Sequence, residues 1–207
     1  MNRRTLFLLA LGLATLAPAP ALLGDDEAGF VALFNGKDLS GWVTPDNKEL
    51  FTVEDGEIVG RTKGDLKKNE FLASEKTYGD FVLKAKVKLL GGNSGIQFRS
   101  ERKPDGVVAG PQADAAAGYW GLLYEERRRG ILEQYPKELA AKLVHEGDWN
   151  DFVIEATGDH VVIHLNGTKV IDRIDPKFDK TGIIAFQVHV GKPMEVRFKD
   201  VKIKEVK

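Results

Sequence analysis

The chain has 207 residues, 43% of them hydrophobic and 29% charged, which is typical of one globular domain with its own core. Its 30 basic and 31 acidic residues nearly balance, so the basic excess on which nucleic-acid binding depends is missing. The sequence contains no cysteine, which excludes disulfides, thiol catalysis and cysteine-ligated metals.

Residues 1–24 predict an export signal. Arg3 and Arg4 precede the apolar run LFLLALGLATLA, and the small-residue segment PAPA follows it. This run is shorter than the roughly 20 residues needed to span a bilayer, which disfavours a membrane anchor. We therefore expect one mature domain over residues 25–207, exported from the cytoplasm and without stable membrane insertion.

Two early segments predict structure rather than chemistry. In ALFNGKDLSGW (residues 32–42), Phe34 and Trp42 flank a turn at Asn35-Gly36 and are expected to be buried. Trp149 is likewise expected to be buried in the core. The segment 78–90 alternates apolar residues with Lys84, Lys86 and Lys88, as a strand with one solvated face does.

Three further strands carry a pair of polar residues at a spacing of two. In GNSGIQFRS (92–100), Ile96 and Phe98 would face the core, and Gln97 and Arg99 would share the opposite face. The same alternation pairs polar residues in segments 110–115 and 185–191, namely Gln112 with Asp114 and Gln187 with His189.

These pairs differ from the lysine-bearing strand. A solvated face repeats long charged residues, whereas a site combines short donors, acceptors and a titratable group. The three pairs together therefore indicate a site. For each pair alone the simpler alternative stays open: an exposed ion pair for Arg99, a surface position for His189, and a polar loop for Gln112 with Asp114.

The rest of the chain adds strands and one short helix. Segment 135–147 predicts the helix, starting at Pro136. Segment 151–174 predicts two hairpins, with turns at Gly158 and at Asn166-Gly167. A change of phase near Lys199 and Asp200 predicts a bulge. The expected fold is an all-β, antiparallel β-sandwich of jelly-roll type with one short helix.

The segments that begin at residues 32, 92, 147 and 182 (ALFNGKDLSGW, GNSGIQFRS, GDWNDFVIEATGDHVVIHLNG and GIIAFQVHVGKPMEVRFKDVKIKEV) together resemble the 3-keto-disaccharide hydrolase domain family. The resemblance implies a concanavalin A-like lectin/glucanase jelly roll, in the periplasm or outside the cell of a bacterium. It also implies action on glycosides whose C3 hydroxyl has been oxidised to a ketone. In one respect the chain departs from the family pattern: Gln112 and Asp114 stand where many members have glutamate and glutamine.

A ketone at C3 makes the C2 proton acidic, so cleavage can proceed by proton abstraction, elimination at C1 and hydration. This route needs a base, a group that holds the ketone oxygen and an acid for the leaving group. We assign these roles to His189, Arg99 and Asp114, respectively. Substrate contacts are assigned to a further set: Gln97, Gln112, Gln187, Tyr119, Trp120, Tyr124 and Glu125.

The aromatic pair Tyr119 and Trp120 has two interpretations. Either ring can stack on a sugar, but strand alternation lets only one of them face the ligand, and core packing is the alternative for Trp120. Glu125 joins Asp114 and His189 as a conceivable ligand of a divalent metal, although no close ligand motif is visible and no cofactor is required.

Two other classes of function compete. A retaining glucanase would need two carboxylates about 5 to 5.5 Å apart, and the compact E-x-D-x-x-E motif of such enzymes is absent. A non-catalytic carbohydrate-binding module needs only aromatic and amide contacts, so it remains the alternative. The ligand is an oxidised glycoside or related carbohydrate in either case, and the sequence does not indicate an oligomeric state.

Overall fold

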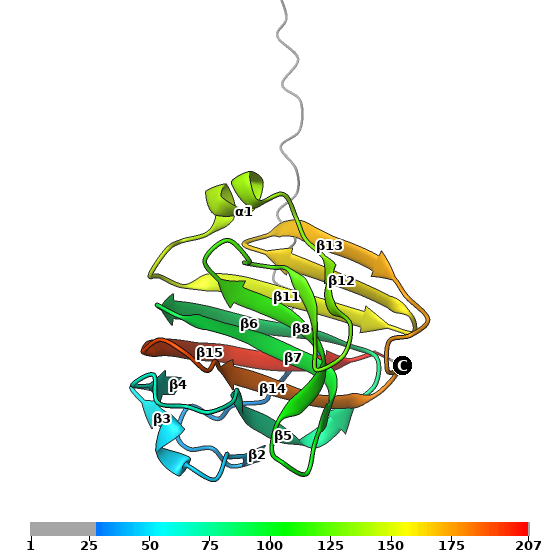
Figure 1. Ribbon diagram of the computed structural model, residues 1–207. Helices are drawn as coiled ribbons and strands as arrows, with labels where there is room; N and C mark the ends of the chain where they lie inside the picture. The colour runs from blue at the N-terminus through cyan, green and yellow to red at the C-terminus, as the bar shows by residue number, and fades with distance from the viewer. Residues whose placement is uncertain (1–27, 207) are drawn as a thin grey trace, which may run out of the picture.

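Two antiparallel sheets lie face to face in the computed structural model, which describes residues 28–206 (Figure 1). The expected export signal lies outside these residues. The helical segments are the 3-10 helix η1 (Lys48–Leu50) and α1 (Lys137–Leu143). The strands are β1 (Val31–Ala32), β2 (Trp42–Val43), β3 (Phe51–Glu54), β4 (Glu57–Thr62), β5 (Glu70–Tyr78), β6 (Phe81–Leu90), β7 (Asn93–Arg102), β8 (Val108–Ala116), β9 (Leu123–Glu126), β10 (Gly130–Glu133), β11 (Asn150–Thr157), β12 (His160–Leu165), β13 (Thr168–Ile174), β14 (Gly182–Val188) and β15 (Met194–Glu205).

Each sheet mixes strands from distant parts of the chain. The first, which we call sheet A, has the order β13-β12-β11-β6-β15-β4-β3, and β1 also pairs with β15. The second, sheet B, has the order β10-β9-β8-β7-β14-β5-β2. The register of β15 against β6 shifts between Lys199 and Lys202, and Asp200 adopts a left-handed φ of 51°. This bulge is the one that the change of phase predicted.

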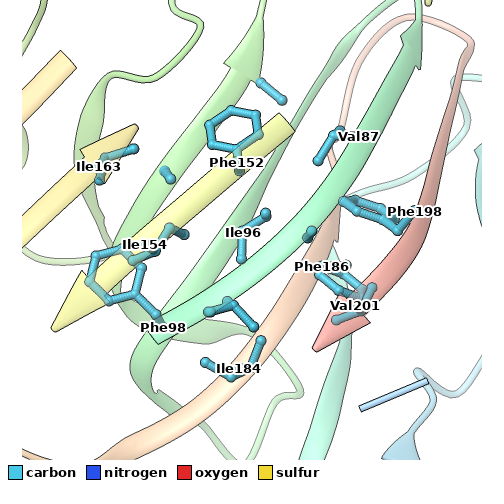
Figure 2. Close-up of a cluster of buried hydrophobic side chains, with 14 of the residues drawn as sticks. Val87, Ile96, Phe98, Phe152, Ile154, Ile163, Ile184, Phe186, Phe198 and Val201 are labelled. Atoms are coloured by element: carbon cyan, nitrogen blue, oxygen red, sulfur yellow. The ribbon is translucent and has the colours of Figure 1, made fainter. Parts of the chain in front are cut away.

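The core lies between the sheets and is built by two-residue alternation. On β6, Phe81, Leu83, Ala85, Val87 and Leu89 are all buried in it. Side chains from both sheets meet there, as Figure 2 shows for Val87 and Phe198 of sheet A and for Ile96 and Phe186 of sheet B. The rings of Trp42, Phe186 and Phe198 stack in sequence, with centroids 5.0 Å and 4.0 Å apart. Burial of this apolar surface is the main stabilising contribution to the fold.

The sequence-based expectations for the fold are confirmed, with one exception. The all-β sandwich, the short helix after Pro136, the two hairpins and the burial of Phe34 and Trp42 are all observed. Trp149 is the exception, because it is half-exposed on the outer face of sheet A, where the ammonium groups of Lys88 and Lys199 lie over its ring. Within residues 28–206, no helix has the length and apolarity needed to cross a membrane.

Candidate functional site

A cavity of about 340 Å³ opens on the outer face of sheet B, a size within the range of small-ligand sites. Side chains from the middle of the sheet and from the loop after β8 surround it. The lining residues are Asn69, Asn93, Gln112, Asp114, Tyr119, Leu122, Tyr124, Glu126, Ile131, Gln187 and His189.

Strand alternation delivers the polar residues to this cavity. On β8, Ala113 and Ala115 belong to the core, so Gln112 and Asp114 project from the opposite face. The Gln112 side chain lies across Gly95 of β7, where an added Cβ would come within 2.6 Å of its Cδ. Glycine at position 95 is therefore what leaves room for Gln112 on the cavity floor.

A chain of side-chain amides connects the two carboxylates of the cavity. The Gln112 Nε2 group donates to Asp114 Oδ1 (2.5 Å) and to Gln187 Oε1 (3.4 Å), and Gln187 Nε2 donates to Glu126 Oε2 (3.3 Å). Asn69 Nδ2 also donates to Glu126 Oε2 (3.5 Å). Both amide protons of Gln112 are thus used within the wall, whereas Gln187 and Asn69 each use one, and each carboxyl group keeps one oxygen for a ligand.

Burial makes both carboxyl groups easier to protonate. Desolvation, against the lowering effect of the hydrogen bond from Gln112 and with a smaller contribution from the charge of Glu126, raises the pKa of Asp114 to about 7. Desolvation also raises the pKa of Glu126, against the lowering effect of His189 and of the amides of Gln187 and Asn69. Asp114 can therefore be a neutral hydrogen-bond donor near neutral pH.

His189 has a defined tautomer in this wall. Its Nδ1 lies 2.5 Å from the carbonyl oxygen of Val190. Because a carbonyl only accepts, Nδ1 must carry the proton, so the neutral ring keeps its lone pair on Nε2. The turn is fixed further by Asn69, whose Oδ1 accepts from the backbone N–H of Val190 (3.0 Å). A neutral imidazole held in this way can act as a base.

The two adjacent aromatic residues separate, although both lie in the turn after β8 and not in a strand, so strand alternation is not the reason. Tyr119 lines the cavity and is 39% exposed, whereas Trp120 is 4% exposed and stacks on Phe152 in the core, with centroids 6.1 Å apart. The alternative of core packing therefore holds for Trp120, which is not a sugar platform. Tyr124 lines the cavity as expected, and the buried Oδ1 of Asn93, also in the lining, has no hydrogen-bond partner within the described chain.

Arg99 lies away from the cavity, which corrects its assignment to the ketone oxygen. At Arg99 the backbone takes a left-handed φ of 44°, and the β7–β8 register shifts between Gln97 and Glu101, so the alternation that would pair Arg99 with Gln97 is broken. The Arg99 guanidinium is 1% exposed. It donates to the carbonyls of Gly79 (2.8 Å) and Gly158 (2.7 Å) and to Asp80 Oδ1 (2.5 Å). Arg99 thus links, by hydrogen bonds, the β5–β6 and β11–β12 connections at one end of the sandwich.

Two other assigned residues, Gln97 and Glu125, are also displaced from the lining. Glu125 is 1% exposed and accepts hydrogen bonds from Nε and Nη2 of Arg129 (2.5 and 2.9 Å), so it cannot meet a sugar or a metal in the cavity. Gln97 lies behind the cavity floor, where its amide hydrogen-bonds to that of Gln112 (2.8 Å). It can affect a ligand only through Gln112.

The sequence-based interpretation missed Glu126 and Asn69. Counting alternate residues from the buried Leu123 would have placed Tyr124 and Glu126 together on the outer face, and Glu125 on the other. Asn69 precedes its strand, and no local pattern distinguishes it. Across residues 28–206, no group of three or more histidine or acidic side chains is arranged to hold a metal ion.

Comparison with known proteins identifies the domain. The family model of the 3-keto-alpha-glucoside-1,2-lyase-like domain matches residues 29–204, nearly the whole chain. A search of curated proteins gives no significant match.

Solved structures agree on the architecture. A protein from Parabacteroides distasonis ATCC 8503, described as a glycosyl hydrolase, is 25% identical with a TM-score of 0.66, covering 90% of this chain and 99% of its own. The carbohydrate-binding module CBM66 from Bacillus subtilis is 19% identical with a TM-score of 0.55, over 86% and 96% of the two chains. The β-glucanase of Bacillus licheniformis is 12% identical with a TM-score of 0.55, over 86% and 97%. The last two show the fold alone, a jelly roll of glucanase and lectin type.

Proposed function

The chain belongs to the 3-keto-alpha-glucoside-1,2-lyase-like family, and on this premise we propose that it cleaves 3-keto-glycosides in the cavity of sheet B. The observation that carries the proposal is the juxtaposition of two groups in one wall. His189 offers a lone pair on Nε2, and Asp114 offers a carboxyl group whose pKa burial raises to about 7, so that a large fraction of it is protonated at neutral pH. A base and a neutral acid together suit abstraction of a proton next to a ketone.

In the proposed reaction, His189 Nε2 takes the proton from C2 of the oxidised sugar. The C2–H electron pair forms the enolate, whose negative charge gathers on the C3 oxygen. Asp114, in its neutral form, donates a hydrogen bond to that oxygen and takes over the role first assigned to Arg99. This changes the earlier assignment of Asp114 as the acid for the leaving group.

The C1–O bond then breaks with the electron pair of the enolate, and the His189 imidazolium returns its proton to the departing oxygen. Water adds across the new C1–C2 double bond, with its hydroxyl at C1 and a proton at C2. The sum is hydrolysis of one glycosidic bond. Gln112, Gln187, Tyr119 and Tyr124 are proposed to contact the sugar hydroxyls and ring.

The test compares a 3-keto-disaccharide with its unoxidised parent, following product release by NMR. We expect cleavage of the keto sugar alone, because only a C3 ketone acidifies the C2 proton. Lys86→Ala, on the outer face of sheet A, is the matched control and should cleave at the wild-type rate. Equal cleavage of the parent sugar would contradict the ketone-dependent route.

A non-catalytic carbohydrate-binding module is the second candidate function. It is favoured by the absence of any arginine or lysine from the cavity lining among residues 28–206, since binding through amides and aromatic rings needs no fixed cation. Saturable binding of the keto sugar without product formation would support this candidate.

Export completes the proposal. The leader-like sequence of residues 1–24 would place the activity outside the cytoplasm. Mass spectrometry of the mature protein should find an N-terminus between about Leu22 and Ala28, and a mature protein that retains Met1 would contradict export with cleavage.

A further inference from the structure

The cavity of sheet B contains a carboxyl group that has no role in the elimination step, that of Glu126. Elimination leaves a C1–C2 double bond conjugated with the C3 ketone, so C1 is the electron-poor carbon at which water adds. Water is a weak nucleophile, and a carboxylate that takes its proton while the C1–O bond forms makes it a stronger one. The hydration step therefore needs a base close to C1.

Glu126 lies at the other end of the cavity from Asp114. On β9, Glu126 is the cross-strand partner of Gly110, and Gly110 and Asp114 are roughly 13 Å apart along β8 at about 3.3 Å per residue. The side-chain amides of Gln112 and Gln187 connect the two carboxyl groups, through hydrogen bonds 2.5 to 3.4 Å long. The two carboxyl groups thus face a ligand from different sides.

Glu126 is also connected to the turn that holds His189. Asn69 Nδ2 donates to Glu126 Oε2 (3.5 Å), and Asn69 Oδ1 accepts from the backbone N–H of Val190 (3.0 Å). The carbonyl of Val190 in turn accepts from Nδ1 of His189 (2.5 Å). One side chain, that of Asn69, therefore fixes Glu126 and the His189 turn relative to each other.

The order of the sugar carbons matches the order of these groups. C3, C2 and C1 are consecutive in the ring, so a sugar with its C3 oxygen at Asp114 and its C2 at His189 directs C1 away from Asp114, toward Glu126. Glu126 Oε2 accepts the hydrogen bonds from Gln187 and Asn69, whereas Oε1 accepts none within residues 28–206. Oε1 is therefore the oxygen that can hold a water molecule against C1.

We propose that Glu126 is the general base of the hydration step, a role that rests on the proposed elimination. Glu126 Oε1 takes one proton from the water as its oxygen bonds to C1. The π electrons of the C1–C2 bond move to form the enolate, whose C3 oxygen Asp114 again holds by a hydrogen bond. The proton on Glu126 then passes to C2 and the ketone re-forms. Water supplies both added groups, and both carboxyl groups end in their starting protonation states.

The surroundings of Glu126 suit a group that takes a proton and then returns it. Such a group works best when its pKa lies near the working pH. Burial raises the pKa of Glu126 above its ordinary value of 4.5, and the charge of a protonated His189 is the largest opposing effect. Because His189 is neutral again once the leaving group has been protonated, this opposition is absent during hydration.

The first test supplies the elimination product itself, the 1,2-unsaturated 3-keto sugar, to the whole mature protein and follows the loss of its ultraviolet absorbance. We expect the wild type to hydrate it above the uncatalysed rate, and Glu126→Gln to do so roughly 10²-fold or more slowly. Glutamine keeps an oxygen that can accept from Gln187 and Asn69, so the melting temperature should not fall. Glu75→Gln, an exposed position on β5 outside the cavity lining, is the matched control and should hydrate at the wild-type rate.

The second test supplies a 3-keto-disaccharide. Glu126→Gln should still release the leaving sugar, but the unsaturated keto sugar should accumulate in place of the hydrated product, which a general structural loss would not cause. Failure of the wild type to hydrate the unsaturated sugar, wild-type hydration by Glu126→Gln, or equal slowing of release and hydration in that variant would overturn the proposal. Release by the wild type with only unsaturated product would overturn it and leave the elimination intact. Hydration without release would instead contradict the proposed elimination.

Discussion

Glu126 and Asp114 face one cavity from neighbouring strands, and the charge of Glu126 adds to the burial that raises the pKa of Asp114 to about 7. The amides of Gln112 and Gln187 bridge the two carboxyl groups. A buried acidic pair holds a proton that an exposed pair would lose, because desolvation disfavours the charged form of each carboxyl group. The proposed chemistry depends on this property of the site.

The first prediction concerns stability against pH. The Asp114 pKa in the folded chain lies above its ordinary value of 3.8, so between about pH 4 and pH 7 the folded state holds a proton that the unfolded state has lost. Unfolding free energy should therefore fall as pH rises through this window, by at most about 1.4 kcal/mol per unit from this group.

Asp114→Asn keeps an acceptor oxygen for Gln112 and cannot titrate, so its unfolding free energy should decline less over the same window. Urea unfolding of both proteins from pH 4.5 to pH 8 measures the difference. Parallel pH profiles would mean that Asp114 is ionised throughout.

The second prediction separates Arg99 from the site. Arg99→Ala leaves the carbonyls of Gly79 and Gly158 and the Asp80 carboxylate without their buried donor, and should lower the unfolding free energy by roughly 2 to 4 kcal/mol. Lys86→Ala removes a solvent-exposed side chain that pairs with Asp151 and should cost less than about 0.5 kcal/mol. Below its melting temperature, Arg99→Ala should bind the keto sugar within twofold of the wild type. A large loss of affinity in the folded variant would show that Arg99 contacts the ligand.

The third prediction separates two adjacent aromatic residues. Tyr119→Ala should weaken sugar binding with little change in stability, because the ring is half-exposed and lines the cavity. Trp120→Ala should cost roughly 3 to 5 kcal/mol of unfolding free energy, because it removes a buried ring that stacks on Phe152. Calorimetric melting and sugar titration of both variants measure these two effects. Similar losses of sugar affinity in both variants, with stability unchanged, would contradict the assignment of Tyr119 to the cavity and Trp120 to the core.

The fold and part of the site could be predicted from the sequence because both follow two-residue alternation. That rule places Gln112 and Asp114, and also Gln187 and His189, in the cavity once the core side of each strand is known. It fails at Arg99, because a left-handed residue and a register shift interrupt β7, and no local signal in GIQFRS marks the break. The same rule, applied from the buried Leu123, would have selected Glu126 instead of Glu125.

Trp149 shows a different limit. Its size predicts burial, but the outcome depends on which neighbours the fold supplies, and lysines from β6 and β15 cover it on an outer face. The opposed lysines of these strands likewise follow from a pairing register that the sequence of either strand alone does not contain.

The central claim is that His189 removes the C2 proton of a 3-keto-glycoside in this cavity. It is tested most directly by turnover in heavy water, with deuterium at C2 of the product measured by mass spectrometry after subtraction of exchange in the free keto sugar. Elimination followed by hydration predicts deuterium at C2 in the wild type, and a fall in turnover of roughly 10²-fold or more in His189→Ala, with a much smaller change in affinity. Turnover without deuterium at C2 above background would contradict elimination, and a fully active His189→Ala would assign the base to another group.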